Sequence, residues 1–221
     1  MLGPLEVRAG SGELLEVGGA RLRTLLIMLA LRPGQLVPAS QLIDGLWPDH
    51  PPAGAPNALQ ALVSRLRRAL PDAVIESRPA GYQLTLDPAD TDIVRFGELA
   101  AAGQALLRTD PAAAAATLRE ALKLWRGPAL VDVAGTEFGE AVIARLDEQK
   151  LAAIEHRVDA DLLTGVTEPL VAELRHTRRR NARTRAGLEL VRRPGRDNHP
   201  AVDNRDLVGQ HVRFLEVLGG E

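Results

Sequence analysis

The sequence predicts a mainly α-helical protein in which a small α+β domain precedes an all-helical one. Apolar residues recur with a helical period from Ala20 onward, and short strand-like runs occur only before residue 88. Aromatic residues make up only 3% of the chain, and much of its apolar content is alanine. Because alanine is the strongest helix former, this composition favours packed helices.

Two short strands and a helix are expected first. Leu2–Val7 and Leu14–Val17 are strand-like runs around the turn Gly10-Ser11-Gly12. From Ala20 the period changes, because four leucines fall at i, i+3, i+4 and i+7: Leu22, Leu25, Leu26 and Leu29. Pro33-Gly34 then ends this helix.

A short helix, a stiff loop, a second helix and a hairpin follow. The short helix is expected near Ser40–Leu46, and four prolines stiffen the loop after it. The second helix is expected over residues 57–70, with an apolar stripe formed by Leu59, Leu62, Val63, Leu66 and Leu70. Residues 75–86 contain two strand-like runs around Pro79-Ala80-Gly81, which predict a hairpin. This order is typical of a winged helix, which presents one helix to a DNA groove and a wing to the backbone beside it.

The 57–70 helix is polar opposite its apolar stripe. At about 100° per residue, the polar positions are Asn57, Gln60, Ser64 and Arg68, with Arg65 and Arg67 on the two flanks. A guanidinium can reach O6 and N7 of guanine or clamp a phosphate, while Asn57 and Gln60 can read adenine or bind a phosphate oxygen. The pattern also fits an ordinary amphipathic helix with a solvated face. The proline loop before it and the hairpin after it favour DNA binding.

After a compact linker at Asp87–Asp90 the chain is expected to be helical. One helix is expected over Asp92–Arg108, and Asp110-Pro111 is a start signal for a second helix that reaches Trp125. A longer helix over residues 138–163 and a short one after Pro169 follow. Paired helices with short connections predict a TPR-like scaffold, so we expect domains at residues 1–88 and 91–175.

Residues 176–221 form an arginine-rich tail in which turn formers and charges dominate. Apolar periodicity is weak there until Val212–Leu218, so we expect a poorly ordered segment with residues 176–205 mobile. Because a helix pair cannot bury its apolar face without a neighbour, the face left uncovered on the preceding helices is expected to promote self-association.

Charge is distributed unevenly along the chain, whose net charge is −2. Residues 1–90 carry 8 arginines and 9 acidic residues, residues 91–174 carry 8 basic and 14 acidic residues, and residues 175–221 carry 11 arginines and 6 acidic residues. A protein that is not basic overall can still bind nucleic acid if its positive groups cluster on one face.

The sequence gives little support to an enzyme, a metal-binding protein, a secreted protein or a membrane protein. No phosphate-binding loop, nucleophile elbow or metal-ligand spacing occurs, so no catalytic residue, metal or cofactor is expected. With no cysteine, disulfides are excluded and a reducing cytoplasm is the natural setting. No apolar run approaches the roughly 20 residues of a membrane span, and residues 1–10 do not resemble a signal peptide.

A resemblance strengthens this interpretation. LVPASQLIDGLWPDHPPAGAPNALQALVSRLRRAL followed by IESRPAGYQL resembles the OmpR-type winged helix of the AfsR/SARP-type antibiotic-regulatory activators. Residues 124–130, LWRGPAL, and residues 145–155, RLDEQKLAAIE, resemble the bacterial transcriptional activator domain that follows in that family. Together the two matches cover about residues 2–175.

The resemblance implies an activator of secondary-metabolite genes that binds direct repeats in double-stranded promoter DNA, recruits RNA polymerase and is able to dimerise. It would act in the cytoplasm at the nucleoid. It implies base-readout candidates at Asn57, Gln60, Ser64, Arg65 and Arg68, and phosphate contacts at Arg67 and at Arg78 of the wing. The loop Pro48–Pro56 matches the segment that touches polymerase in related winged helices. Trp47, Tyr82 and Trp125 are expected in the core.

The sequence departs from the family's pattern at both ends. It starts inside the family's first strand, and after Leu174-Arg175 it does not resemble the further helix pairs, which indicates truncation or divergence. A second hypothesis is therefore a helical protein-interaction module whose degenerate winged helix does not bind DNA. The net charge of −1 over residues 1–90 is its main support.

Overall fold

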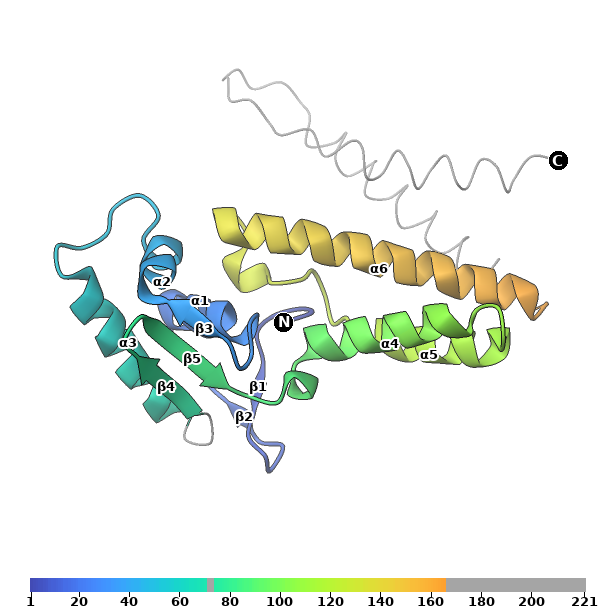
Figure 1. Cartoon of the computed structure of the whole chain (residues 1–221), viewed down its shortest axis with the longest axis horizontal. Coiled ribbons are helices and arrows are strands. Elements are labelled where there is room, and N and C mark those ends of the chain that lie inside the picture. The colour runs from blue at the N-terminus through green and yellow to red at the C-terminus, as the bar shows by residue number, and fades with distance from the viewer. Residues whose placement is uncertain (71–73, 166–221) are drawn as a thin grey trace, which may run out of the picture. The chain divides into compact units, whose positions relative to one another are not determined.

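The computed structural model of the chain describes residues 1–70 and 74–165 (Figure 1). All of them belong to one compact unit, Met1–Val171. The helix predicted after Pro169 and the properties predicted for residues 176–221 lie outside the described residues. Within the described ranges, no helix combines the length and the apolar character that a membrane crossing needs.

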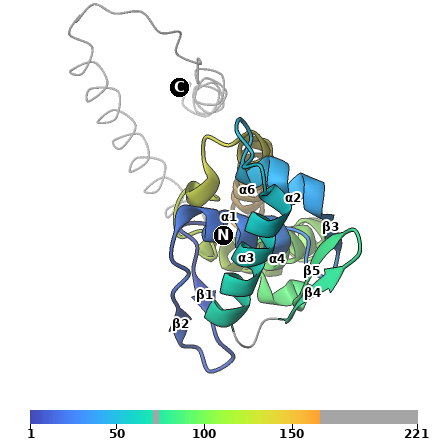
Figure 2. The same ribbon diagram turned by 90° about the vertical axis from the view of Figure 1, so that its left-hand side faces the viewer.

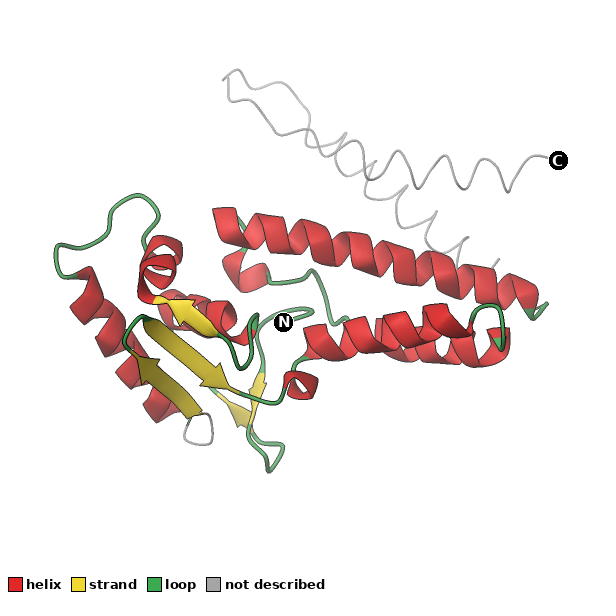
Figure 3. Cartoon of the chain, viewed as in Figure 1, coloured by secondary structure: helices red, strands yellow, loops and turns green. Residues whose placement is uncertain are grey.

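The fold class predicted from the sequence is confirmed: helices dominate, and two small sheets lie in the N-terminal half (Figure 3). The N-terminal half contains β1 Val7–Arg8, β2 Leu14–Leu15, α1 Ala20–Ala30, β3 Leu36–Pro38, α2 Ala39–Leu46, α3 Ala55–Ala69, β4 Val74–Arg78 and β5 Gly81–Thr85. The helical half contains the 3-10 helix η1 Pro88–Asp90, α4 Asp92–Leu106, α5 Pro111–Lys123, the 3-10 helix η2 Val131–Val133 and α6 Glu137–Leu163.

The core of the N-terminal half forms around α1. The four predicted leucines are buried, and Leu25 and Leu29 are completely so. Helices α2 and α3 and strand β5 pack against α1. Leu42 of α2 and Leu59 and Leu66 of α3 belong to the same core. The three helices and the β4–β5 hairpin form a winged helix (Figures 1 and 2).

The larger sheet has three antiparallel strands in the order β3-β5-β4. The hairpin β4–β5 was predicted, whereas β3 was not, because it is three residues long and ends in proline. It pairs Val37 with Tyr82, and both side chains are buried at 2% and 9% exposure. The expectation that Tyr82 is a core residue is therefore confirmed, while Trp47 and Trp125 are only half-buried against the core.

The first predicted strand is wrong over most of its length. Only Val7–Arg8 pairs, with Leu14–Leu15, and residues 2–5 make no strand. The reason is that their backbone groups bond elsewhere: the Leu2 N–H donates to Asp92, and the Leu5 N–H donates to Asp132. Pro4 between them has no N–H to offer a ladder.

The helices of the C-terminal half begin at side-chain caps. Asp110 accepts a hydrogen bond from Ala113 N at 3.0 Å, as its sequence predicts, and Thr136 caps α6 through Gly139 N at 3.2 Å. Helices α4, α5 and α6 pack on one another through Phe96, Leu118 and Leu146, which are fully buried. The rings of Trp125 and Phe96 are nearly perpendicular at a centroid distance of 5.3 Å, and the Lys150 ammonium lies 4.2 Å from the Trp125 centroid.

Gly81 allows β3 and β5 to approach each other. A Cβ at this position would lie 2.0 Å from the Val37 carbonyl oxygen and 2.9 Å from Pro38 Cα, and both are backbone atoms. We expect Gly81→Ala to lower the free energy of unfolding by about 1–3 kcal/mol, the usual cost of overpacking. Equilibrium denaturation by urea measures this change.

Gly97 provides the matched control. It lies within α4, and a Cβ there would meet no atom within 4 Å. Since alanine is the better helix former, Gly97→Ala should raise the free energy of unfolding by about 0.5–1 kcal/mol. The close approach of β3 would be contradicted if Gly81→Ala left the free energy of unfolding unchanged or raised it as Gly97→Ala does.

Candidate nucleic-acid interface

The polar face predicted for the second helix is the exposed face of α3. The structure extends this helix by two residues at its start, to Ala55. Its buried positions are Ala55, Leu59, Val63 and Leu66, and the last three are at most 1% exposed. The exposed polar residues of the helix are Asn57, Gln60, Ser64, Arg65, Arg67 and Arg68. All six candidates of this helix are therefore exposed.

Charge on this helix is of one sign. Between Ala55 and Ala69 there are three arginines and no acidic residue. No side chain caps the start of the helix at Gly54, and no acidic side chain stands in its first turn, so nothing there offsets the positive end of the helix dipole. A surface of this kind attracts phosphate even though the whole N-terminal half is close to neutral.

Arg67 ties α3 to the hairpin. Its Nε donates to the carbonyl oxygen of Ile75 at 2.9 Å, and its Nη2 donates to Ser77 Oγ at 3.0 Å. Both acceptors belong to β4. The sequence did not reveal this role, because the bond joins two elements whose docking angle only the fold determines. Arg67 thus fixes the hairpin against the helix, whether or not it also contacts phosphate.

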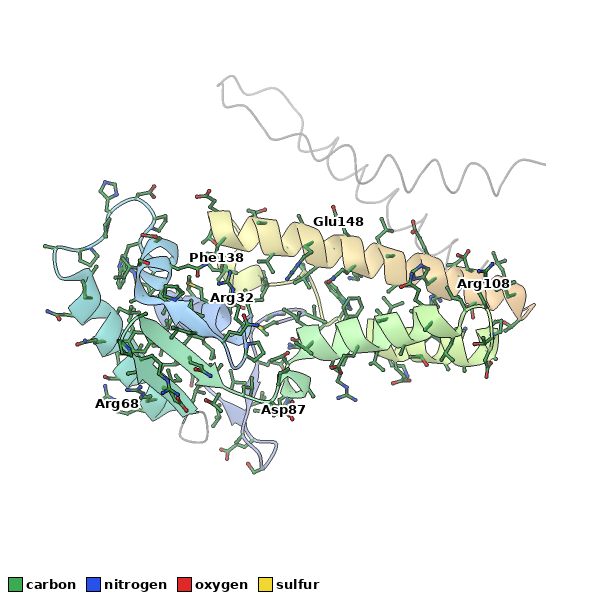
Figure 4. All side chains as sticks on the ribbon, viewed as in Figure 1. Arg32, Arg68, Asp87, Arg108, Phe138 and Glu148 are labelled. Carbon is green, nitrogen blue, oxygen red and sulfur yellow. The ribbon has the colours of Figure 1, made fainter. Side chains whose placement is uncertain are left out.

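Arg68 differs from Arg67 although the two are adjacent. Its one hydrogen bond among the described residues goes to the Ser64 carbonyl of its own helix, at 3.3 Å. The side chain projects from α3 away from the helical half (Figure 4). Arg68 is therefore available for a ligand without disturbing the fold.

The hairpin places Arg78 at its tip. The strands are joined by Pro79 and Ala80, with Arg78 opposite Gly81. The Arg78 guanidinium pairs with the Glu76 carboxylate, and its side chain is 54% exposed. This pair partly neutralises the positive charge at the tip of the hairpin.

Sequence reasoning overlooked one residue of the α3 face. Ala61 is exposed and lies one turn after Asn57, between the polar side chains. A search for hydrogen-bonding groups passes over alanine, but a small apolar side chain suits the methyl group of thymine in the major groove.

Two family models match the chain. The model described as "Transcriptional regulatory protein, C terminal" matches residues 18–84, and the "Bacterial transcriptional activator domain" matches residues 91–192. The first match covers α1 to β5, and the second begins just before α4.

Individual relatives are similar over both halves. The regulatory protein DnrI of Streptomyces peucetius is 38% identical over 187 residues, which cover 79% of this chain and 68% of the relative. The transcriptional regulator RedD of Streptomyces coelicolor is 36% identical over 185 residues, which cover 79% of this chain and 52% of RedD.

A solved structure shares the fold. Mycobacterium tuberculosis EmbR, in complex with a low affinity phosphopeptide, superposes with a TM-score of 0.75 at 29% identity, covering 82% of this chain and 49% of EmbR. The chain thus spans about half the length of EmbR and of RedD. With both domains matched in order, the chain belongs to the AfsR/SARP-type family of antibiotic-regulatory transcriptional activators, DNA-binding regulators with an OmpR-type winged helix followed by a bacterial transcriptional activator domain.

Proposed function

We propose that α3 enters the major groove of double-stranded promoter DNA while the β4–β5 hairpin lies along the neighbouring sugar-phosphate backbone. One observation carries this proposal. The exposed face of α3 holds three arginines and no acidic residue, and Arg67 holds that helix at a set angle to the hairpin. Helix and wing then reach the duplex together.

The residues divide by what they can contact. Arg65 and Arg68 suit guanine O6 and N7, while Asn57 and Gln60 suit adenine. Ser64 can bond to either kind of base edge. Arg67 and Arg78 suit phosphate, which positions the protein without reading sequence. In Arg67 this contact would be additional to its bonds with β4.

The helical half suits a protein partner. On α6, the exposed acidic side chains include Glu148 and Glu155, and residues 91–174 carry 14 acidic residues against 8 basic ones. Such a surface is repelled by DNA phosphates. The proposed partner is RNA polymerase, with a second copy of the chain bound at the next direct repeat. The proposed targets are secondary-metabolite genes. The protein would act in the cytoplasm at the nucleoid, without cofactor or catalytic step.

The first prediction from this proposal concerns readout by α3. Arg65→Ala or Arg68→Ala should each weaken specific DNA binding by about 1–3 kcal/mol, because a bidentate arginine–guanine contact is lost. Arg78→Ala should weaken all sequences about equally. Fluorescence anisotropy with labelled promoter DNA and a scrambled duplex, at several salt concentrations, measures both effects.

Arg108→Ala is the matched control, since this exposed arginine lies in the helical half, far from α3 (Figure 4). Its affinity for DNA should equal that of the unmodified protein. The proposal fails if Arg65→Ala and Arg68→Ala also bind normally. If the unmodified chain shows no salt-dependent binding to any duplex, the alternative is favoured, a helical interaction module with a degenerate winged helix.

A second prediction separates Arg67 from its neighbour. Arg67→Ala removes the bonds to Ile75 and Ser77, so it should lower the free energy of unfolding by about 1 kcal/mol. Arg68→Ala should change it by less than about 0.5 kcal/mol, as is usual for surface sites. Urea denaturation of the two variants in parallel measures both changes. Equal free energies of unfolding would exclude a role for Arg67 in holding the hairpin against α3.

A third prediction concerns the acidic face of α6. The double variant Glu148→Gln/Glu155→Gln should reduce activation in a reconstituted transcription assay while leaving DNA affinity unchanged. The reason is that the charges would face polymerase and not DNA. Glu98→Gln on α4, where Glu98 is also exposed, is the control and should activate normally. Undiminished activation by the double variant would remove α6 as the contact surface.

A further inference from the structure

The N-terminal segment of the chain lies against the helical half. The Arg126 N–H donates to the Leu2 carbonyl at 2.7 Å, and the Leu130 N–H donates to the Met1 carbonyl at 2.9 Å. Leu2 is completely buried. In the segment that precedes α6, each of three residues is at most 2% exposed: Ala129, Leu130 and Val133. The two halves are therefore joined here as well as through the linker around η1.

Asp132 of η2 is bonded on both oxygens by groups of the N-terminal half. Its Oδ2 accepts from the Leu5 N–H at 2.7 Å, and its Oδ1 accepts from Arg23 Nη1 at 3.0 Å. Arg23 is itself held in place, because its Nε donates to the Val17 carbonyl at 2.9 Å. The Asp132 side chain is only 10% exposed. The Arg23 side chain is 45% exposed, so water partly screens this ion pair. Loss of the carboxylate nevertheless leaves the part-buried Leu5 N–H without an acceptor.

Asp92 at the start of α4 makes a similar junction nearby. Its Oδ2 accepts from the Leu2 N–H at 2.8 Å and lies 2.6 Å from the amino group of Met1. Arg126 reaches both Asp92 and Glu6. This second carboxylate is 22% exposed, so it is more open to water than Asp132.

The loop that carries Asp132 is strained at Leu130. This residue has a φ of 49°, the one positive value among the non-glycine residues of the described chain. The left-handed conformation costs a leucine about 1–2 kcal/mol and persists only where its surroundings determine it. Here the Leu130 side chain is buried at 1% exposure, and the turn sets η2 against α1.

An apolar contact also joins the halves on α2. A Cβ built on Gly45 would lie 3.6 Å from Phe138 Cδ1 of α6, so the phenyl ring is close to that helix. Burial of apolar surface is non-directional, so it holds the halves together without setting the angle between them. Hydrogen bonds to a carboxylate are directional, so they constrain the angle between the elements that they join.

We propose that Asp132 is a positioning residue that fixes the orientation of the helical half relative to α3. Leu5 and Asp132 lie 127 positions apart in sequence, so their bond joins the halves far along the chain from the short linker at Leu86–Thr91. Its consequence for transcription rests on the proposed function. With the orientation fixed, a winged helix bound to DNA delivers α6 to one place beside the promoter.

Spin-label distances test the orientation directly. The chain has no cysteine, so Ser40→Cys on α2 and Ala116→Cys on α5, both exposed, can be labelled without background. We expect one narrow distance distribution in the otherwise unmodified protein and a broad one after Asp132→Ala. Arg23→Ala should broaden it too, and the double variant should be no broader than Asp132→Ala, because both substitutions remove the same bond.

Asp90→Ala is the matched control. Asp90 is an exposed aspartate of η1, between the halves, and its substitution should leave the distribution narrow. If Asp132→Ala fails to fold by circular dichroism, Asp132→Asn serves instead, because its amide oxygen still accepts from Leu5 while the charge that holds Arg23 is lost. A distribution as narrow in the folded Asp132 variant as in the unmodified protein overturns the proposal.

The functional readout separates positioning from general destabilisation. Asp132→Ala should bind promoter DNA within about twofold of the unmodified protein, because the substitution is remote from α3. Activation should fall several-fold, since α6 is no longer held in place. Normal activation together with a broadened distribution would overturn the role in activation. If the α3 variants bind DNA normally, the proposed docking fails, yet the distance measurement still decides the role of Asp132.

Discussion

Burial of α1 is the constraint on which the rest of the structure depends. Seven of its eleven residues are buried, so this short helix is apolar on nearly every side. Within the winged helix, α2, α3 and β5 pack against α1. From the helical half, η2 also packs against it. A helix with this pattern cannot remain in water, and the elements that enclose it therefore acquire fixed places. The position of α3 and the meeting of the two halves both follow from that enclosure.

The sequence predicted what is local and periodic. Three such features are the leucine stripe of α1, the amphipathic pattern of α3 and the cap at Asp110. The residues that form each feature are close together in the sequence, and each feature was found where it was expected. The hairpin β4–β5 was also predicted, because its turn residues stand between two apolar runs.

What the sequence did not reveal depends on segments that are distant along the chain. Strand β3 is defined by its partner β5, more than forty positions later, and not by its own three residues. The N-terminal residues resemble a strand, but their N–H groups are taken by Asp92 and Asp132. Likewise, Arg67 is a residue type that often contacts DNA, but its guanidinium donates hydrogen bonds to β4 within the protein. Among the site candidates, the sequence indicated which side chains are exposed, whereas only the fold distinguishes those that are already engaged.

Charged residues of one sign gather on individual helices, so the net charge of a whole domain does not describe its surfaces. Helix α3 carries only arginines among its charged residues, while the neighbouring wing pairs Arg78 with Glu76 and the long helix α6 exposes acidic groups. The near-neutral total over residues 1–90 therefore says little about DNA binding, since the field at a surface depends on the nearest groups.

The two tryptophans give this arrangement an optical consequence. Trp47 lies at the end of α2 with the Arg21 guanidinium 5.9 Å from its ring centroid, and Trp125 lies in the helical half between Phe96 and Lys150. Each half thus contains one half-buried indole beside a cation. Replacing either tryptophan by phenylalanine leaves a chain whose tryptophan fluorescence comes from the other half alone. Exposure to denaturant can then be followed in each half by emission wavelength, without any attached dye.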